Sequence, residues 1–142
     1  MTTDVFQFEQ AAGHLIRRAH QVSVATFMDE TADFGATPVQ FAILTRLLKA
    51  PGTDQISLAS SVAHDAATIG SVIARLERRG WLRREPDAAD RRRKLLWLTP
   101  EGEAVANAMV PCVKRVQERI LAPLNVDERS QLLLLLTKLA ET

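Results

Sequence analysis

Residues 65–98 constrain the fold more than any other stretch of the sequence. They begin at an aspartate that can cap a helix, and apolar residues at helical spacing continue to Gly80. Two runs rich in Trp, Leu and Arg follow, at 81–85 and 93–98, with the polar connection 86–91 between them. These runs predict two strands. We therefore expect a helix that ends at a glycine and leads into a β-hairpin.

The same stretch concentrates positive charge. Between Arg75 and Lys94 there are nine Lys and Arg residues against four Asp and Glu, whereas the whole 142-residue chain has a formal net charge of only +1. Such segregation predicts a polyanion partner, although a charge run taken alone is more often a solvated surface. Some of these charges could also pair internally, Arg75 and Arg79 with Glu77 and Asp90.

A further short helix is expected before this stretch, capped by Thr53 or Asp54. Two short helices joined by a tight turn and followed by a basic hairpin form a winged helix-turn-helix pattern. Asp65 is the expected cap of the second of them. The residues expected to face inward are Ile56, Leu58, Ala59 and Val62 in the first helix, and Ile69, Val72, Ile73 and Leu76 in the second.

Longer helices are expected on both sides of this unit. Phe8, Leu15 and Val22 recur every seven residues, which favours a helix over residues 6–32 with one apolar face. Thr37-Pro38 starts a second helix because threonine caps and proline suits the first helical position. Its expected inward residues are Phe41, Leu44, Leu47 and Leu48.

Two helices are expected to complete the chain. Thr99 precedes a proline and starts the first, and Asn125 with Glu128 resembles a capping box that opens the second. The inward stripe of the first is expected to be Val105, Met109, Val113, Val116 and Ile120. Five consecutive leucines, 132–136, make the last helix apolar most of the way round, so it needs cover on more than one side.

In a chain this small, a second copy is the simplest cover for that helix. We therefore expect one structural domain that is mainly α with a small β-hairpin. It would be a winged helix-turn-helix whose N- and C-terminal helices form a dimerisation layer. Residues 1–36 and 99–142 would form the helical dimerisation region, and residues 37–98 the DNA-binding region.

The sequence holds no pattern typical of an enzyme, a metal site or a membrane protein. It lacks a Gly-rich phosphate loop and a nucleophile elbow. Its one cysteine, Cys112, cannot form an internal disulfide, and His14, His20 and His64 have no zinc-ligand spacing. No run approaches the ~18 apolar residues of a membrane span, and no signal peptide is visible. We expect a cytoplasmic protein without cofactor or catalytic residues.

Four motifs, in this order, resemble those of the MarR family of bacterial winged helix-turn-helix regulators. They are Thr37-Pro38-Val39-Gln40, Leu76-Glu77-Arg78-Arg79-Gly80-Trp81, Asp90-Arg91-Arg92 and Leu98-Thr99-Pro100-Glu101-Gly102. The resemblance covers nearly the whole chain. It implies a homodimer that binds a pseudo-palindromic operator in double-stranded DNA and usually represses nearby genes. It also implies release from DNA by a small effector, often aromatic or phenolic.

The resemblance also assigns DNA-binding residues. Residues 66–75 match the helix that lies in the major groove. Asp90 and Arg92 match a motif of the hairpin in which the acid orients an arginine that enters the minor groove. Because the helix carries mostly short side chains, base readout would fall on Thr68, Ser71 and Arg75, and Ala66 and Ala67 would make only apolar contacts. The hairpin would then carry more discrimination than usual. The full expected set is Ala66, Ala67, Thr68, Ser71, Arg75, Asp90, Arg91, Arg92 and Arg93.

Ligand binding rests on the resemblance as well. It implies a pocket between the first helix and the DNA-binding region, where His14, Arg17 and Arg18 could receive an acidic ligand because arginine matches a carboxylate. Alternatively, the two arginines form surface or interface ion pairs. Two other functions stay open, namely a winged-helix module that binds a protein in place of DNA, and a repressor that senses oxidation through Cys112.

Overall fold

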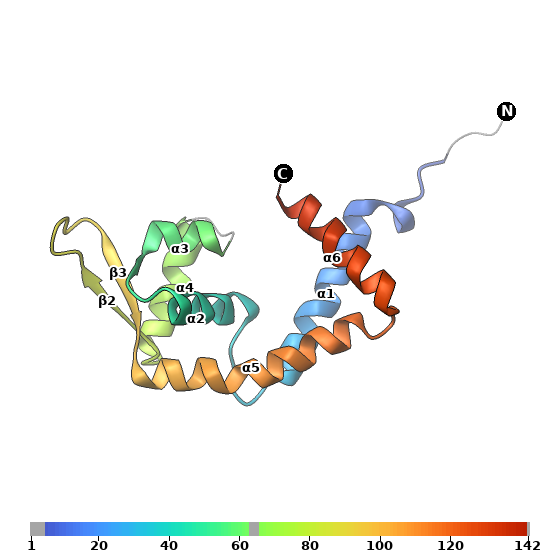
Figure 1. The fold of residues 1–142 in the computed structure, drawn as a ribbon. Coiled ribbons are helices and arrows are strands. Elements are labelled where there is room, and N and C mark those ends of the chain that lie inside the picture. Colours follow the sequence, from blue (N-terminus) through green and yellow to red (C-terminus); the bar gives the residue numbers. More distant parts are fainter. Residues whose placement is uncertain (1–4, 63–65, 142) are drawn as a thin grey trace.

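The computed structural model describes residues 5–62 and 66–141. Its elements are η1 (Phe8–Gln10), α1 (Ala12–Glu30), α2 (Pro38–Lys49), β1 (Thr53–Asp54), α3 (Gln55–Ser61), α4 (Ala66–Arg78), β2 (Leu82–Pro86), β3 (Lys94–Leu98), α5 (Pro100–Leu121) and α6 (Val126–Ala140). Figure 1 shows α2, α3, α4 and the sheet at one end of the long helix α5, and α1 and α6 at the other. The fold is mainly helical with one small sheet, which confirms the expected fold class.

The N-terminal helix is shorter than predicted. Ala11 adopts an extended conformation (φ −69°, ψ 135°), which separates the 3₁₀ turn η1 from α1. Within a single chain, α1 buries only Thr26 and Phe27, near its C-terminal end. The apolar face marked by Phe8, Leu15 and Val22 is more than half exposed. Most of this helix therefore presents apolar side chains to the outside of the chain.

Helix α2 begins and ends where its sequence signals predict. The Thr37 hydroxyl accepts a hydrogen bond from the backbone N–H of Gln40, and the Gln40 side chain accepts one from the N–H of Thr37. Proline occupies the first turn. Ile43, Leu44 and Leu47 are buried, so the residues that α2 presents to the core are close to those expected.

Helices α3 and α4 place their apolar residues inward with one exception. Asp54 caps α3 through the N–H of Ser57, while the hydroxyl of Thr53 donates to the Ala50 carbonyl. The prediction that Ile56 faces inward is wrong, since its side chain is 75% exposed. Ile56 lies two residues before the buried Leu58. Because successive helical residues are rotated by about 100°, the two side chains point to opposite sides of the helix.

In α4, the inward face follows the predicted spacing. Ile69, Ile73 and Leu76 are fully buried, and Val72 packs partly against the same core. The predicted cap Asp65 and the histidine before it, His64, lie outside the described residues.

The sheet has three antiparallel strands in the order β1-β3-β2, one more than predicted. β1 is only two residues long, and it pairs Thr53 with Leu96 and Asp54 with Leu95. The expected strands β2 and β3 are present, each shifted by one residue at its start. We call residues 82–98 the wing. Leu82 and Leu96 are buried, so the base of the wing belongs to the core.

Two glycines shape the junction between α4, the wing and α5. Gly80 (φ +79°) donates to the Glu77 carbonyl while Trp81 donates to that of Leu76, a Schellman motif at the glycine where the sequence predicts the helix to end. The N–H of Thr99 donates to the Trp81 carbonyl at 3.1 Å. A Cβ on Gly102 would lie 1.9 Å from that same carbonyl oxygen, so only glycine fits this position.

Helix α5 joins the two ends of the molecule. Thr99 caps it through the N–H of Gly102, and Ala106, Met109 and Val116 are buried. Its C-terminal half is fixed to α1 by ion pairs, with Arg115 Nε 3.1 Å from Glu30 Oε2 and Arg119 Nη1 2.6 Å from Asp29 Oδ2.

Helix α6 begins with the predicted capping box of Asn125 and Glu128, and it contains no buried residue. Arg129 fastens its first turn by donating to the carbonyls of Leu121 and Leu124. Within residues 5–62 and 66–141, no helix has the length and apolar character that crossing a membrane requires.

Candidate nucleic-acid interface

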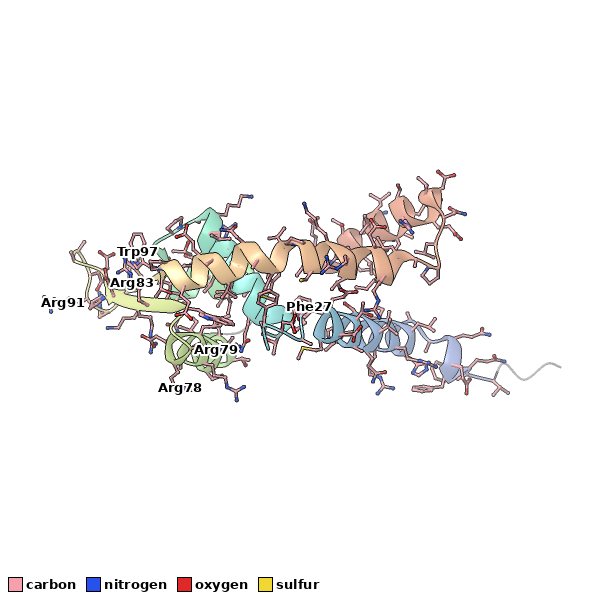
Figure 2. All side chains as sticks on the ribbon, turned by 90° about the horizontal axis from the view of Figure 1, so that it is seen from below. Phe27, Arg78, Arg79, Arg83, Arg91 and Trp97 are labelled. Carbon is pink, nitrogen blue, oxygen red and sulfur yellow. The ribbon has the colours of Figure 1, made fainter. Side chains whose placement is uncertain are left out.

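One face of α4 points away from the core. Thr68, Ser71, Arg75 and Arg78, at spacings of 3, 4 and 3, are exposed on it. Figure 2 shows Arg78 on the outer side of this helix. The Ser71 hydroxyl donates to the Thr68 carbonyl at 2.9 Å. In this conformation the Ser71 oxygen can therefore only accept a further hydrogen bond. The side chains of Ala66 and Ala67, also expected in the DNA-binding set, lie outside the described part.

At the tip of the wing, an aspartate orients an arginine. Asp90 Oδ1 accepts from Arg92 Nε at 3.2 Å and from the Arg92 backbone N–H at 3.1 Å. These two hydrogen bonds, the side-chain one first, lower the pKa of Asp90, so its carboxylate is charged at neutral pH. The Arg92 side chain is nevertheless 91% exposed. The expected contact between the two residues is present, and their role toward DNA stays a prediction.

Arg79 binds groups of its own chain, although its side chain is exposed. Its guanidinium donates to the carbonyls of Phe34 and Gly35, at 2.6 and 2.9 Å, in the turn between α1 and α2. It also lies 3.6 Å from the ring centroid of Trp81. Arg79 therefore ties the end of α4 to the preceding helices.

The internal pairs expected from the sequence have other partners. Glu77 pairs with Arg84 on β2 at 3.0 Å, and Asp90 pairs with Arg92. The prediction that Arg75 and Arg79 pair with these acids was wrong. The sheet brings Arg84 close to Glu77 on α4. The spacing of residues along α4 alone could not predict this contact, because Arg84 lies on a strand.

Arg93 differs from the other expected DNA contacts. Its two terminal nitrogens lie 3.3 Å from Asp54 Oδ1 and 3.4 Å from Asp87 Oδ2. Arg83 on β2 likewise pairs with Glu85, and its guanidinium lies 5.3 Å from the Trp97 ring centroid. Both arginines are thus engaged with groups of their own chain.

Four cations remain on this side without an ion pair among the described residues: Arg75, Arg78, Arg91 and Lys94. Arg91 lies at the far tip of the wing (Figure 2). Arg78 and Lys94 were absent from the expected set. Arg78 could have been found, because it lies three residues after Arg75 on the same helical face. With Arg92, these cations could contact phosphates and groove edges along a duplex.

Cys112 is half buried on α5, where Arg115 Nη2 lies 3.3 Å from its sulfur. Arg115 also binds Glu30. The chain has no second cysteine that could resolve an oxidised sulfur as a disulfide. Among the described residues, no three His, Cys, Asp or Glu side chains are grouped to hold a metal ion.

The candidate ligand residues lie on the outer part of α1. The His14 ring packs on Phe8 with centroids 4.4 Å apart, and Arg17 Nη2 lies 3.5 Å from His14 Nδ1. Neither Arg17 nor Arg18 forms an ion pair within the described part of the chain.

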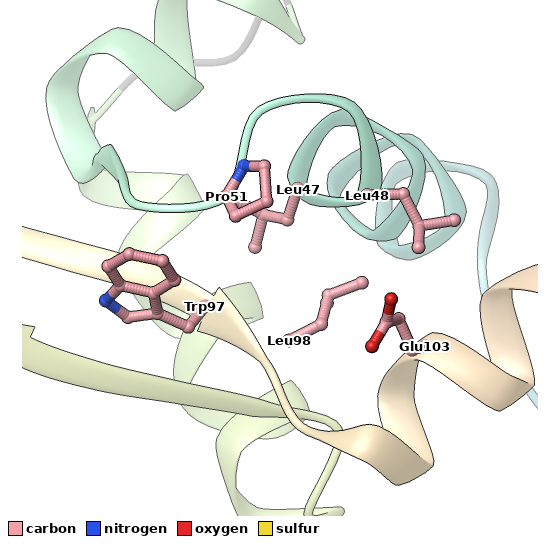
Figure 3. A pocket seen from close by; sticks show the side chains of 6 residues that line it. All are labelled: Leu47, Leu48, Pro51, Trp97, Leu98 and Glu103. Atoms are coloured by element: carbon pink, nitrogen blue, oxygen red, sulfur yellow. The ribbon is translucent and has the colours of Figure 1, made fainter.

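A hollow of about 190 Å³ lies between α2, β3 and the start of α5 (Figure 3). Its lining residues are Leu47, Leu48, Pro51, Trp97, Leu98 and Glu103. A second hollow, beside η1, is lined by Val5, Phe6, Gln7, Gln10 and Ala11. His14, Arg17 and Arg18 line neither of them, so a single chain does not assemble these three residues around either cavity.

The MarR family model matches residues 36–94, which include α2, α3, α4, β2 and the start of β3. The HTH-type transcriptional repressor NicR of Pseudomonas putida is 34% identical over 96% of this chain and 87% of its own length. The solved structure of Bordetella bronchiseptica BpsR, whose DNA binding is regulated by 6-hydroxynicotinic acid, matches with a TM-score of 0.92 and 35% identity, covering 97% of this chain and 99% of BpsR. The repressor CouR, bound to a 23-mer DNA duplex, matches with a TM-score of 0.87 and 28% identity over 97% of this chain and 99% of CouR.

Proposed function

This chain belongs to the MarR family of transcriptional regulators, and we propose that it acts in the cytoplasm as a homodimeric repressor that a small aromatic acid releases from a pseudo-palindromic operator. The observation that carries DNA binding is Arg92, held by Asp90 and 91% exposed at the wing tip. The outward face of α4, with Thr68, Ser71 and Arg75, supplies the second contact. In this arrangement α4 enters a major groove and the wing follows the adjacent minor groove.

Replacing Arg92 by alanine should weaken binding of the operator by about 1–3 kcal/mol, because an oriented guanidinium in a narrow minor groove is lost. The operator is the duplex that the wild-type protein selects from a random pool, and affinity is measured by titration at fixed salt. Arg91→Ala is the matched control, since Arg91 is exposed on the same tip without a carboxylate that orients it. Unchanged affinity of Arg92→Ala would remove the proposed role.

The same two variants test how the wing reads DNA. Changing the flanks of the operator from A·T to G·C pairs widens the minor groove and should weaken wild-type binding. Arg92→Ala should lose most of this preference, and Arg91→Ala should keep it. If both variants keep it, another residue reads the minor groove.

Dimerisation is proposed from the surfaces of α1 and α6. Leu133, Leu134, Leu135, Leu136 and Leu139 are 44–66% exposed in the single chain, and Phe8, Leu15 and Val22 add to the apolar surface at the same end of the molecule. Exposed apolar residues in this number mark an interface, and a second copy would cover them with the same residues. The two α4 helices would then lie about one DNA turn apart.

The effector class is proposed from a relative and from charge. BpsR responds to 6-hydroxynicotinic acid, a hydroxylated aromatic acid. In this chain Arg17 and Arg18 supply positive charge on α1 beside His14, next to the proposed dimer interface, where a carboxylate would find a guanidinium. Release of the operator complex by 6-hydroxynicotinic acid or a hydroxybenzoic acid, weakened in Arg17→Ala, is the expected result. A wild-type complex insensitive to every such acid would contradict this part of the proposal.

A further inference from the structure

We propose that Arg93 is a positioning residue, which with Asp54 and Asp87 fixes the wing on the start of α3 and thereby sets where Arg92 lies relative to α4. This inference rests on the proposed DNA binding. It assigns to Arg93 a role different from the direct DNA contact expected from the sequence. We call the three residues the wing brace.

The brace is a single guanidinium shared by two carboxylates. Arg93 Nη2 lies 3.3 Å from Asp54 Oδ1, and Arg93 Nη1 lies 3.4 Å from Asp87 Oδ2. The two carboxylates are only 15% and 18% exposed, whereas the Arg93 side chain is 52% exposed. The acids are thus held in place by their surroundings, and the arginine spans the space between them.

On the side of the helix-turn-helix, Asp54 is fixed by its own local structure. Its carboxylate accepts from the Ser57 hydroxyl at 2.6 Å and from the Ser57 backbone N–H at 3.2 Å, which caps α3. The Ser57 hydroxyl first, then its N–H, and then Arg93 lower the pKa of Asp54, so the carboxylate is charged at neutral pH. Asp54 also pairs with Leu95 in the sheet.

On the side of the wing, Asp87 closes the loop that carries Arg92. Its N–H donates to the Arg93 carbonyl at 2.9 Å, and its carboxylate accepts from the N–H of Ala89. The N–H of Arg93 donates to the Asp90 carbonyl, also at 2.9 Å. The loop therefore has its own hydrogen bonds, and Arg93 joins it to a residue 39 positions earlier in the chain.

Charge argues against a direct role of Arg93 on DNA. Two carboxylates lie within 3.4 Å of its guanidinium, so a phosphate would have to compete with both of them. A half-exposed ion pair contributes little to global stability. The effect of the brace is then orientation, because a wing free to tilt would present Arg92 at many positions.

Replacing Asp54 and Asp87 by asparagine distinguishes a positioning role of Arg93 from a direct phosphate contact, because the two roles predict opposite changes in operator affinity. If Arg93 contacts phosphate, Asp54→Asn and Asp87→Asn remove negative charge near DNA and should tighten binding. If Arg93 positions the wing, both variants should weaken binding of the selected operator, by roughly threefold to tenfold. Asparagine caps a helix about as well as aspartate, so Asp54→Asn keeps the cap of α3.

Arg93→Ala should weaken binding to a similar extent, and the double variant Asp54→Asn/Arg93→Ala should be no weaker than Arg93→Ala alone. Glu85→Gln is the control, because Glu85 pairs with Arg83 inside the wing and not with α3. It should leave affinity unchanged or raise it. Tighter binding by both Asp→Asn variants, with a salt dependence reduced by about one phosphate contact in Arg93→Ala, would overturn the proposal.

A second measurement needs no DNA. In the free protein, the backbone amides of Asp87 and Arg93 should exchange hydrogen faster in Asp54→Asn than in wild type, while the unfolding temperature stays the same. If the amides of Asp87 and Arg93 exchanged at the wild-type rate in Asp54→Asn, the proposed brace would be wrong even if operator binding were weaker. If the wild-type protein selected no duplex at all, the proposed function would fail, and amide exchange would still decide whether the brace exists.

Discussion

Replacing Gly102 by alanine is expected to destabilise the protein by about 1–3 kcal/mol or more, because overpacking against backbone is hard to relieve. The added Cβ would lie 1.9 Å from the Trp81 carbonyl oxygen and 2.7 Å from its carbon. That oxygen accepts the N–H of Thr99, and the Thr99 hydroxyl binds both the Gly80 carbonyl and the N–H of Gly102. Any movement that relieves the contact therefore disturbs the junction of α4, the wing and α5.

Gly13→Ala is the matched control for Gly102→Ala. Gly13 also lies in the first turn of a helix, but an added Cβ there meets no atom within 4 Å. Alanine is the better helix former, so this variant should be neutral or more stable by up to about 1 kcal/mol. Urea unfolding at one fixed protein concentration measures both, since dimer stability depends on concentration. Equal midpoints for the two variants would contradict the packing account.

Replacing Leu135 and Leu136 together by glutamate is expected to abolish dimerisation and specific operator binding. Both leucines are exposed in the single chain, and buried charge in an apolar interface without a partner is costly. Glutamate is a good helix former, so α6 itself should persist. A monomer holds one half-site only, and its affinity should fall toward the non-specific value, on the order of 10³-fold or more below wild type.

The control for this pair is Ser130→Glu with Gln131→Glu, which adds the same number of charges to exposed polar positions of α6. Sedimentation equilibrium gives the mass of each variant, and operator titration gives its affinity. The control should remain a dimer and bind normally. A dimeric Leu135/Leu136 variant that still binds the operator would place the interface elsewhere.

Local cap signals predicted the first residues of three helices. Thr37, Thr99 and Asn125 each cap a helix where the sequence indicates, because a cap involves only residues three positions apart. The turn at Gly80 follows for the same reason. The MarR resemblance, inferred from motifs of this local kind, is confirmed by the family match and by the solved structures.

Features that depend on distant segments could not be predicted in this way. The strand β1 is two residues long and exists only because β3 pairs with it. Arg79 binds the Phe34 carbonyl 45 positions away, Arg84 binds Glu77 7 positions away, and Arg93 binds Asp54 39 positions away. The number of Lys and Arg residues in the sequence therefore predicted the basic region. It could not distinguish the cations that bind groups of the same chain from those that are free to contact DNA.

The most direct test of operator binding by a homodimer is to select duplexes from a random DNA pool with the wild-type protein and sequence those that bind. A homodimer that reads DNA with α4 and the wing should enrich an inverted repeat, with half-site centres about one helical turn apart and A·T-rich positions where the wings lie. Enrichment of no sequence, or of a site without two-fold symmetry, would show that the protein does not bind DNA as a symmetric dimer.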